Sequence, residues 1–285
     1  MRCRTIRTRV PPLLKSWARA PLDLAMEIVE TISGTRDELT PPRRLRTKFV
    51  HTITAREYRE AGQAYLRFFI ELCALKPDDI VLEIGSGCGR IAAALTEHLS
   101  DRGRYEGLEI VGAGVAWCRA VISSRFPAFH FQTADVYNRH YNPKGRYPAH
   151  AYRFPFADAS FDFVFLSSVF THMLPDEVQQ YFSEIARVLK PGGRCLITYF
   201  LWNDEAAEFY RAGKSRFDFY CDHDIYRTEN PAVPETAICF SERFIVDLYA
   251  QTGLILKHPP WYGTWCGRPH ILSGQDVIVA WKPCG

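Results

Sequence analysis

The stretch IVLEIGSGCGR (Ile80–Arg90) carries the strongest structural signal in the sequence. A short apolar run that contains Glu83 is followed by three glycines at alternate positions, Gly85, Gly87 and Gly89. A tight turn between a strand and a helix needs residues that tolerate a positive φ, and a ligand that passes over the turn needs the space left by a missing Cβ. The helix that follows offers unpaired N–H groups, which attract a carboxylate or a phosphate. This turn is therefore predicted to bind an adenosine-type ligand with an anionic end.

Around this turn, apolar stretches of strand length alternate with amphipathic stretches of helix length. Such alternation is typical of βαβ units and a parallel sheet, which binds ligands at the carboxyl ends of its strands. Only a loop separates the last two strands, so that pair is expected to be antiparallel. We predict strands at Ile80–Ile84, Tyr105–Ile110, His130–Thr133, Phe161–Leu166, Arg194–Phe200, Leu254–His258 and Asp276–Trp281, and helices at Leu22–Ile32, Ala55–Lys76, Ile91–Leu99, Ala113–Ser124, Asp176–Leu189 and Glu242–Gln251.

Length and composition are those of an ordinary globular protein. The 285 residues, 47% hydrophobic and 24% charged, suffice for one large core or for a core with a small lid. No stretch approaches the roughly 18 consecutive apolar residues of a membrane-spanning helix. The net charge of +3 is too small to indicate nucleic acid by itself. Residues 1–50 hold 11 Lys and Arg against 5 Asp and Glu without the apolar segment of a signal peptide, which predicts a basic, solvated N-terminal extension.

The nine cysteines, an odd number, occur without any CxxC spacing. Several stand inside apolar runs, as Cys73 and Cys195 do, so we interpret them as free thiols of a reducing compartment, the cytoplasm. The segment CDHD (Cys221–Asp224) gathers possible metal ligands. Neighbours in sequence do not form a tetrahedral site unaided, and no partner cluster is evident, so we expect no metal.

Acidic residues stand at the ends of the two strands that follow the glycine turn. The dinucleotide fingerprint G-x-G-x-x-G would need a third glycine where this chain has Arg90. Glu109 lies 20 residues past Gly89, at the end of YEGLEI, where a carboxylate can accept both hydroxyls of a ribose. Asp135 closes FQTAD in the same way. Each acid alone is equally well explained as a helix N-cap, but three strand ends in register favour a nucleotide site.

At these residues the chain closely resembles the class I S-adenosylmethionine-dependent methyltransferases, over Phe49–Lys282. VLEIGSGCG is similar to the nucleotide loop of that family, YEGLEI to its ribose-binding strand and TADVY to its adenine-side acid. FPFADASFDFVFLSSVFTHM resembles its fourth-strand signature, and EIARVLKPGGRCLITYF the approach to its fifth strand. Taken together, these motifs make the resemblance highly specific.

The resemblance implies an α/β, Rossmann-like fold: a seven-stranded, mostly parallel sheet with the last strand antiparallel and helices on both faces. It implies S-adenosyl-L-methionine as the cofactor. Glu83 stands where many members carry aspartate, and since the charge is kept, little change is expected. The resemblance further implies that Glu83, Gly85, Gly87 and Gly89 hold the methionine part, that Glu109 holds the ribose and Asp135 with the backbone of Val136 the adenine, and that Ser167 lines the cofactor near its sulfonium.

His172 is the nearest titratable candidate for removing a proton from a methyl acceptor. It follows the fourth strand within SSVFTHM, and histidine titrates near neutral pH, as a general base requires. The alternative is a hydrogen-bonded histidine at a helix entry. His223, Tyr262 and His270, from the region in which family members diverge, are weaker candidates.

The segment WYGTWCGRPH (Trp261–His270) gathers aromatic residues and a cation. We predict that Tyr262, Trp265 and Arg268 form a substrate wall, with Arg268 available to a carboxylate or a phosphate. A structured loop that packs its aromatic residues on the core explains the pattern equally well. Aromatic residues at the end of the fifth strand favour an apolar or aromatic small molecule as the substrate.

We divide the chain into a basic N-terminal extension, residues 1–50, and a methyltransferase domain, residues 51–285, in which residues 202–240 and 259–275 form a lid and a loop over the substrate. The favoured function is transfer of a methyl group from S-adenosylmethionine to oxygen or nitrogen of a small-molecule acceptor. One alternative is a methyltransferase that acts on RNA or protein through the basic N-terminus, although no nucleic-acid module is recognisable. Another is a non-catalytic cofactor-binding protein on the same fold. The resemblance leaves the identity of the acceptor open.

Overall fold

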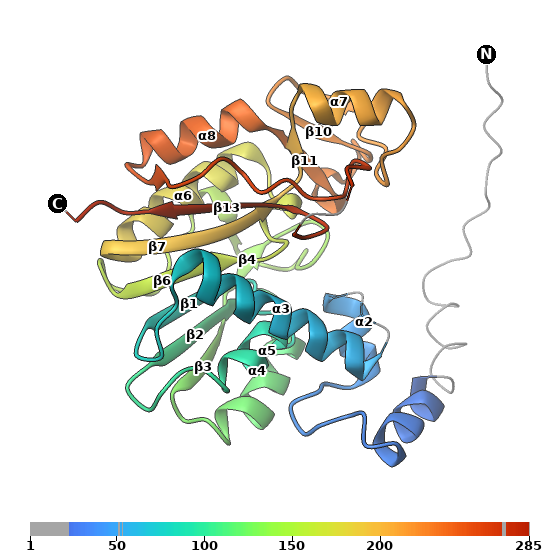
Figure 1. Ribbon diagram of the computed structural model, residues 1–285, viewed down its shortest axis with the longest axis vertical. Coiled ribbons are helices and arrows are strands. Elements are labelled where there is room, and N and C mark those ends of the chain that lie inside the picture. Colours follow the sequence, from blue (N-terminus) through green and yellow to red (C-terminus); the bar gives the residue numbers. More distant parts are fainter. Residues whose placement is uncertain (1–22, 51, 53, 270–271, 285) are drawn as a thin grey trace.

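The structure, a computed structural model, describes residues 23–50, 52, 54–269 and 272–284. At its centre lies a seven-stranded sheet (Figure 1). Its strands are, in spatial order, β12 (Ile255–Leu256), β13 (Asp276–Trp281), β7 (Leu189–Tyr199), β6 (Phe161–Leu166), β1 (Ile80–Ile84), β2 (Arg104–Glu109) and β3 (Phe129–Thr133). Strand β13 is antiparallel to both of its neighbours, whereas β7, β6, β1, β2 and β3 are parallel to one another. The predicted sheet is thereby confirmed.

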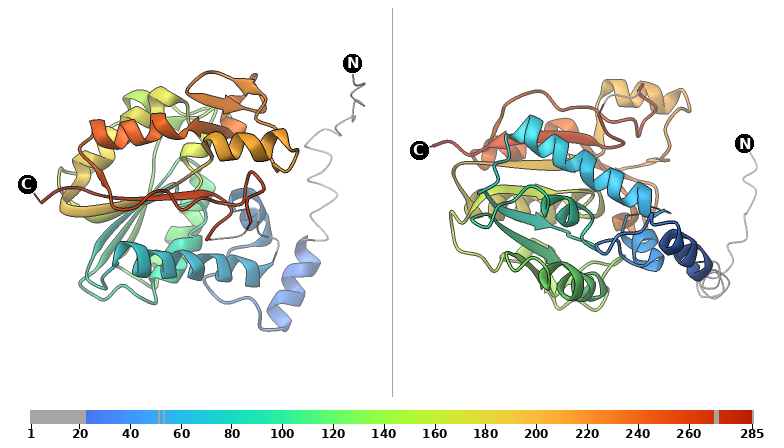
Figure 2. Two further views of the ribbon diagram at one scale, coloured as in Figure 1. Left: turned by 45° about the horizontal axis from the view of Figure 1, so that its top comes forward. Right: turned by 60° about the horizontal axis from the view of Figure 1, so that its bottom comes forward.

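Helices cover both faces of this sheet (Figures 1 and 2). One face carries α3 (Ala55–Cys73), α4 (Arg90–Leu95) and α5 (Gly112–Cys118), and the other carries α6 (Pro175–Val188) and α8 (Glu242–Gln251). Along β6 the side chains alternate between the two layers: Phe163 and Phe165 pack in the first core, and Val164 and Leu166 in the second. Because both faces are buried, the central strands carry apolar residues at nearly every position.

Some element boundaries differ from the expected ones. Helix α4 ends at Leu95 rather than at residue 99, and the helix expected over 113–124 is divided into α5 and a π-helical turn, Arg119–Ser123. Strand β7 begins at Leu189, because the expected turn KPGG belongs to the strand, opposite an irregularity in the pairing with β6. Helix ends and bulges depend on tertiary hydrogen bonds that a local pattern does not contain.

Helix α3 begins at a capping box and reaches the glycine turn. The Thr54 hydroxyl accepts a hydrogen bond from the N–H of Glu57 (3.1 Å), and the Glu57 carboxylate accepts one from the N–H of Thr54 (2.9 Å). One turn further, the Tyr58 hydroxyl donates to the carbonyl oxygen of Cys88 (3.0 Å), within the glycine turn. The start of α3 therefore helps to fix the position of that turn.

Residues 23–50 pack against the rest of the protein. The Glu30 carboxylate accepts hydrogen bonds from the buried guanidinium of Arg46 (2.6 Å) and from the N–H of Ala55 (2.8 Å), at the start of α3. The predicted boundary between extension and domain thus falls inside a packed region, while residues 1–22 of the predicted basic tail lie outside the described residues. The segment contains a helix over 23–32 and α2 (Arg43–Phe49).

Residues 200–241, here termed the cap, form a folded unit beside the carboxyl ends of the parallel strands (Figure 1). Its elements are β8 (Leu201–Trp202), α7 (Asp204–Arg211), β9 (Cys221–Asp222), β10 (Tyr226–Thr228) and β11 (Ile238–Ser241), and its sheet has the order β8-β11-β10-β9. Phe200 and Phe219 of the cap pack with Trp265 in a small separate core. The region predicted as a lid therefore has its own sheet and core.

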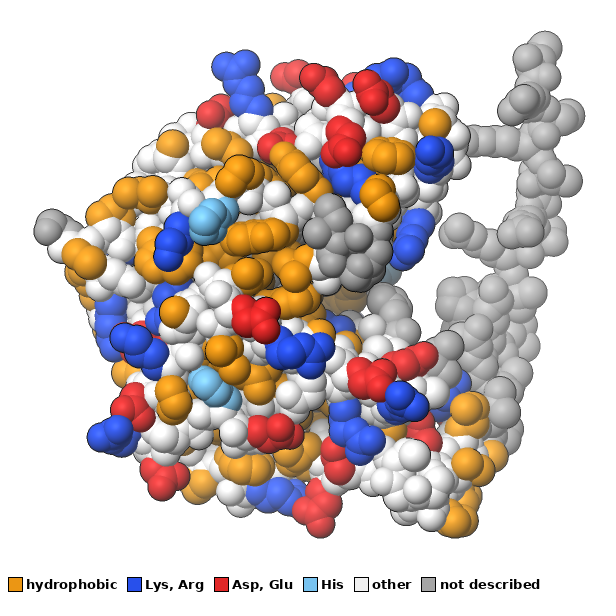
Figure 3. All heavy atoms as spheres, in the orientation of Figure 1, with side chains coloured by type: hydrophobic (Ala, Val, Ile, Leu, Met, Phe, Trp, Pro, Cys, Tyr) orange, Lys and Arg blue, Asp and Glu red, His pale blue; other side chains and the backbone are white. Residues whose placement is uncertain are grey.

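Shorter elements complete the description. Strands β4 (Val136–Tyr137) and β5 (Tyr147–Pro148) pair with each other, and 3₁₀ turns occur at η2 (Ala149–Ala151), η3 (Phe170–His172) and η4 (Pro234–Thr236). No helix in the described part of the chain combines the length and the apolar character needed to cross a membrane. The eight cysteines that the structure describes are free thiols. Acidic and basic side chains are interspersed over the face shown in Figure 3.

Candidate active site

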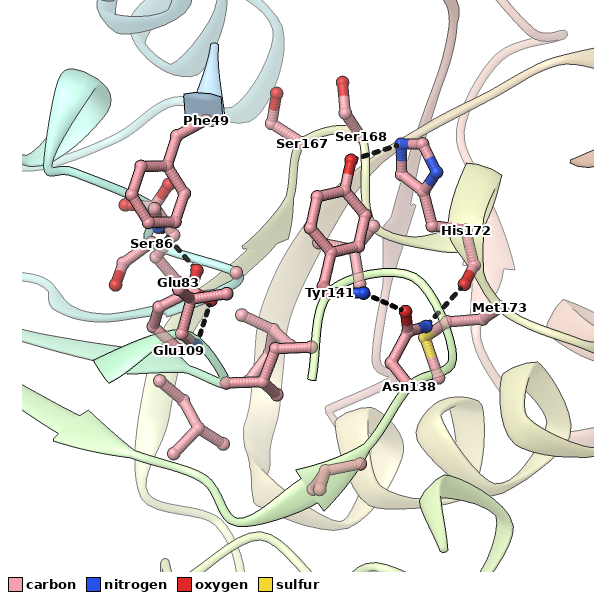
Figure 4. Close-up of a pocket in the computed structure, with 18 of the residues that line it drawn as sticks. Phe49, Glu83, Ser86, Glu109, Asn138, Tyr141, Ser167, Ser168, His172 and Met173 are labelled. Carbon is pink, nitrogen blue, oxygen red and sulfur yellow. Dashed lines mark hydrogen bonds between the residues drawn. The ribbon is translucent and has the colours of Figure 1, made fainter. Parts of the chain in front are cut away.

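A cavity opens at the carboxyl ends of β1, β2 and β6, the edge at which parallel sheets bind ligands (Figure 4). One side is formed by the glycine turn and the ends of β1 and β2, with α2 beside them. The other side is formed by the loop between β4 and β5, by the segment after β6 and by the cap. The lining side chains include Glu83, Ser86 and Glu109 on the first side, and Asn138, Tyr141, His172, Met173, Phe200 and Phe217 on the second.

The three glycines of the turn have different roles, although all have a positive φ: 80° at Gly85, 55° at Gly87 and 81° at Gly89. Gly85 and Gly87 line the cavity, and a Cβ on Gly85 would lie 2.4 Å from Cγ2 of Val169. Gly89 does not line the cavity. A Cβ there would lie 2.6 Å from Cδ1 of Ile122, so this glycine permits close packing behind the turn. The expectation that Gly89 contacts the methionine part is corrected accordingly.

Glu83 is a buried carboxylate of β1 that lines the cavity. The hydroxyl of Tyr105, on the neighbouring strand β2, donates a hydrogen bond to it. Burial raises the pKa of Glu83 to about 8, because the ionised form is poorly solvated there. On the same side of the cavity, Oγ of Ser86 is buried without a hydrogen-bond partner among the described residues. Both groups are suited to polar atoms of a ligand.

Glu109 ends β2 and lies between the glycine turn and α5. Its carboxylate accepts hydrogen bonds from the N–H of Gly87 (2.7 Å) and from the N–H of Val111 (2.8 Å). Burial raises its pKa. Each carboxylate oxygen can accept a second hydrogen bond, so the two hydroxyls of a ribose can still be bound. Glu109 therefore holds the glycine turn in shape as well as lining the cavity.

Asp135 and Val136 are placed differently although they are neighbours. Val136 is buried and lines the cavity, whereas Asp135 does not line it. The Asp135 carboxylate, which is partly exposed, pairs with the guanidinium of Arg146, and this hydrogen bond lowers its pKa. The structure thus does not bring the Asp135 side chain together with the other predicted residues, because the loop after β4 supplies a nearer partner. A role of Asp135 toward adenine stays a prediction.

Ser167 follows β6 and lies between the two sides of the cavity (Figure 4). Its hydroxyl donates to the Tyr65 hydroxyl of α3 (2.7 Å) and accepts from Arg90 (3.4 Å). The next residue, Ser168, has φ 59°, a rare conformation for a residue with a side chain. Its hydroxyl donates to Oε1 of Gln275 (3.0 Å). The turn after β6 is therefore held from both α3 and the loop before β13.

His172 lies in η3 and lines the cavity. Its Nδ1 is 2.9 Å from the carbonyl oxygen of Glu235, in the cap. A carbonyl oxygen can only accept, so the neutral imidazole carries its proton on Nδ1 and a lone pair on Nε2. This Nε2 lies 3.4 Å from the hydroxyl of Tyr141 (Figure 4). The candidate base thus lies in the cavity, with its basic nitrogen facing a tyrosine hydroxyl.

Asn138 connects the loop of Tyr141 to the turn of His172 (Figure 4). Its side chain is buried; Nδ2 donates to the carbonyl oxygen of His172 (3.0 Å), and Oδ1 accepts from the N–H groups of His140 (3.0 Å) and Tyr141 (2.9 Å). Neither Asn138 nor Tyr141 was predicted from the sequence. The available signal was a long loop between strands, which is often functional.

Phe49 is a further lining residue that the sequence did not indicate. It ends α2, and a Cβ on Gly87 would lie 3.5 Å from the Cβ of Phe49 and 3.7 Å from its ring. The segment assigned to a basic extension therefore contributes an aromatic side chain to the glycine turn. An isolated Phe in a stretch of Arg and Lys has no periodic pattern that would have identified it.

The predicted substrate wall is corrected by the structure, since Tyr262, Trp265 and Arg268 do not line the cavity. Nε1 of Trp265 donates to the buried carboxylate of Asp276 (2.7 Å), and Arg268 lies 3.4 Å from the same carboxylate. The Tyr262 hydroxyl donates to Glu242 (2.7 Å). A buried carboxylate must be paired, and this loop supplies its donors, so these residues stabilise the attachment of the cap.

The weaker base candidates are also outside the cavity or not described. His223 stacks on Tyr226 within the cap, with ring centroids 4.5 Å apart, and does not line the cavity. His270 lies outside the described residues. No group of side chains able to hold a metal ion occurs in the described ranges, CDHD included.

Comparisons with known proteins agree with this geometry. Residues 82–197 match a family model described as a methyltransferase domain. A curated relative, phthiotriol/phenolphthiotriol dimycocerosates methyltransferase 1 of Mycobacterium ulcerans (strain Agy99), is 32% identical over 129 residues, which cover 45% of this chain and 40% of the relative. The match thus spans less than half the length of that relative.

Solved structures show the same fold. A protein of Pyrococcus horikoshii OT3 has a TM-score of 0.57 at 16% identity, with 84% of this chain and 97% of that chain covered. An S-adenosylmethionine-dependent methyltransferase of Methanosarcina mazei has a TM-score of 0.52 at 22% identity, with 76% and 98% covered. Residues 82–197 thus form a methyltransferase domain, and the chain has the same fold as a solved S-adenosylmethionine-dependent methyltransferase. The cofactor of this domain is S-adenosylmethionine.

Proposed function

We propose that this protein transfers the methyl group of S-adenosylmethionine to an oxygen or nitrogen atom of a small-molecule acceptor. The observation that carries the proposal is a cavity with two unlike sides: Glu83, Ser86 and Glu109, suited to the cofactor, lie on one, and a cluster of aromatic side chains lies beside His172 on the other. When bound, S-adenosylmethionine supplies an electrophilic sulfonium methyl group. The curated relative is named for phthiotriol and phenolphthiotriol dimycocerosates, which supports an acceptor that is neither nucleic acid nor protein.

The residues on the first side fit this cofactor. The Ser86 hydroxyl has no partner among the described residues, and Glu83 offers a carboxyl that an ammonium group can ionise. The turn carries no side chains at Gly85 and Gly87, where a ligand would approach its backbone. We assign Glu83, Gly85 and Gly87 to the methionine part, Glu109 to the ribose, Asp135 and the backbone of Val136 to the adenine, and Ser167 to the region of the sulfonium.

The second side is suited to an apolar or aromatic acceptor. Such walls exclude water and hold a nucleophile in line with the methyl group, which accounts for much of the rate enhancement in reactions of this kind. His172 accepts the proton that the acceptor loses. The aromatic and apolar lining side chains here are Tyr141, Met173, Tyr181, Phe200 and Phe217.

We further propose that the protein works in a reducing compartment, the cytoplasm. All the cysteines that the structure describes are free thiols, and none of the described residues requires an oxidising environment.

The acceptor class is tested by incubating the protein with isotope-labelled S-adenosylmethionine and two fractions of a cell extract, one of small molecules and one of RNA and protein. We expect label in the small-molecule fraction, followed by identification of the labelled product. Label confined to RNA or protein would refute the small-molecule assignment.

The base is tested with His172→Ala. Turnover should fall by about 100-fold to 10,000-fold, the usual reach of general base catalysis, while the affinity for the cofactor is unchanged. The matched control is His150→Ala, which removes a half-exposed imidazole outside the cavity. A His172→Ala variant that is less stable but turns over at the parental rate would leave His172 as a structural residue.

A further inference from the structure

We propose that Tyr141 contacts the acceptor directly and passes its proton to His172, that Asn138 positions this pair, and that the methylated atom is the oxygen of a hydroxyl group. The inference rests on the proposed function and specifies how the same site activates its acceptor.

The first argument is the direction of the hydrogen bond between the two rings. Nδ1 of His172 donates to the Glu235 carbonyl oxygen (2.9 Å), so Nε2 accepts, and the Tyr141 hydroxyl at 3.4 Å is the donor. The rings meet edge to face, with centroids 5.1 Å apart and planes at 82°. Both side chains line the cavity. An acceptor in the cavity can therefore donate its hydroxyl proton to the lone pairs of the Tyr141 oxygen, and that hydroxyl in turn donates to Nε2 of His172.

The second argument is that this pair is held in place before any acceptor binds. Asn138 is 7% exposed and makes hydrogen bonds to the backbone of both segments, those of Tyr141 and of His172. The backbone of Asn138 also exchanges hydrogen bonds with that of Asn142 (3.1 and 2.9 Å), which closes the loop that carries Tyr141. A preformed pair of this kind suits catalysis, since little reorganisation is needed at the moment of reaction.

The third argument concerns the chemistry. The acceptor oxygen forms a bond to the methyl carbon as the carbon–sulfur bond of the cofactor breaks, with its electron pair leaving on sulfur. The hydroxyl proton of the acceptor moves to the Tyr141 oxygen while the proton of Tyr141 moves to Nε2 of His172, and the imidazolium then loses its extra proton to water. Burial raises the pKa of Tyr141, which keeps it a neutral hydroxyl able to relay a proton. A neutral amine has its lone pair available without such a relay, so the arrangement favours a hydroxyl acceptor.

The test uses Tyr141→Phe, Asn138→Ala and the double variant, with labelled S-adenosylmethionine and the small-molecule extract as the probe. Tyr141→Phe should lower turnover by about 100-fold with the cofactor affinity unchanged. Asn138→Ala should lower turnover as well, but it should have little further effect in the Tyr141→Phe background, because both changes remove the same relay. The matched control is Tyr147→Phe, which removes the hydroxyl of a 51% exposed tyrosine in β5, just after the same loop and outside the cavity.

A second readout does not depend on activity. In the cofactor-free protein labelled with ¹⁵N-histidine, the Nε2 resonance of His172 should shift in Tyr141→Phe and in Asn138→Ala and stay in place in Tyr147→Phe. Parental turnover of Tyr141→Phe, or an unmoved Nε2 resonance, would overturn the relay and leave the proposed function intact. A product methylated on nitrogen would overturn the hydroxyl assignment. A parent protein that transfers no label would overturn the proposed function, and this inference with it.

Discussion

The hydroxyl of Tyr105 on β2 donates a hydrogen bond to the carboxylate of Glu83 on β1, next to the glycine turn. Both side chains are buried, and burial is the main reason why the pKa of Glu83 rises to about 8. In the absence of a cation, this raised pKa favours the protonated form of Glu83 at neutral pH. A ligand with an ammonium group favours the ionised form and must displace that proton.

Cofactor binding should consequently depend on pH. The affinity for S-adenosylmethionine should rise between about pH 6 and about pH 8, by up to about tenfold per unit, because more Glu83 is ionised as the pH approaches its pKa. Titration calorimetry in two buffers with different ionisation enthalpies would measure the affinity and count the proton released. Glu83→Gln should bind weakly and without this pH dependence; a parent affinity that is flat over the range would contradict the assignment.

Stability of the cofactor-free protein should fall over a similar range. Desolvation raises the pKa of the buried carboxyls of Glu83 to about 8 and of Asp276 to about 6, and that of the partly buried Glu177 to about 7. A raised pKa in the folded state stabilises the protein below the unfolded pKa, and this contribution is lost as the pH rises through the folded value. The free energy of unfolding, measured in urea, should therefore decrease from about pH 5 to about pH 8, less steeply for Glu83→Gln.

Two glycine substitutions should separate packing from ligand binding. Gly87→Val should abolish cofactor binding, because a branched side chain at φ 55° would strain the turn and enter the space beside Phe49. Gly89→Ala should chiefly lower the melting temperature, because its Cβ would collide with Ile122 outside the cavity. Melting curves and calorimetry on both variants test this. Normal cofactor binding by Gly87→Val would show that the turn does not approach the ligand.

Phe49→Ala should weaken cofactor binding, since it removes an aromatic side chain from the glycine turn and opens the cavity to water. Truncation of a partly buried Phe costs up to about 3 kcal/mol. The matched control is Ile28→Ala in the same N-terminal segment, where the side chain is 51% exposed and outside the cavity. Equal affinities for the two variants would mean that α2 does not take part in binding.

Arg268→Ala should damage stability and leave cofactor binding unchanged. The Arg268 guanidinium is buried and pairs with Glu205 (2.6 Å) and with Asp276 (3.4 Å). Removing one partner of a buried ion pair typically costs about 3–5 kcal/mol, because a buried charge is left without compensation. Urea unfolding would measure the loss of stability, and calorimetry would show whether the affinity for the cofactor is unchanged. A stable variant with a raised KM for the acceptor would restore the substrate role that the structure argues against.

The sequence by itself determined the sheet and the side of the cavity that carries Glu83 and Glu109. Glu83 and Glu109 stand at set distances from the glycine turn, and parallel strands bring their carboxyl ends to one edge, so local motifs suffice to place these residues together. The bounds of β1, β6 and β13 could be predicted from apolar runs, because a strand that is buried on both faces needs apolar residues at nearly every position.

Only the tertiary structure decided how the opposite side of the cavity, with Tyr141 and Asn138, is built. Tyr141 and His172 are 31 positions apart and meet through the side chain of Asn138, a contact with no periodic signature. The prediction that Arg268 faces a substrate failed for a related reason. In sequence, a cation among aromatic residues looks the same whether it binds a ligand or pairs with a buried carboxylate, and here it pairs with Asp276. Loop side chains find their partners through the fold, since the free energy of pairing a buried charge depends on what lies near it in space and not on its neighbours along the chain.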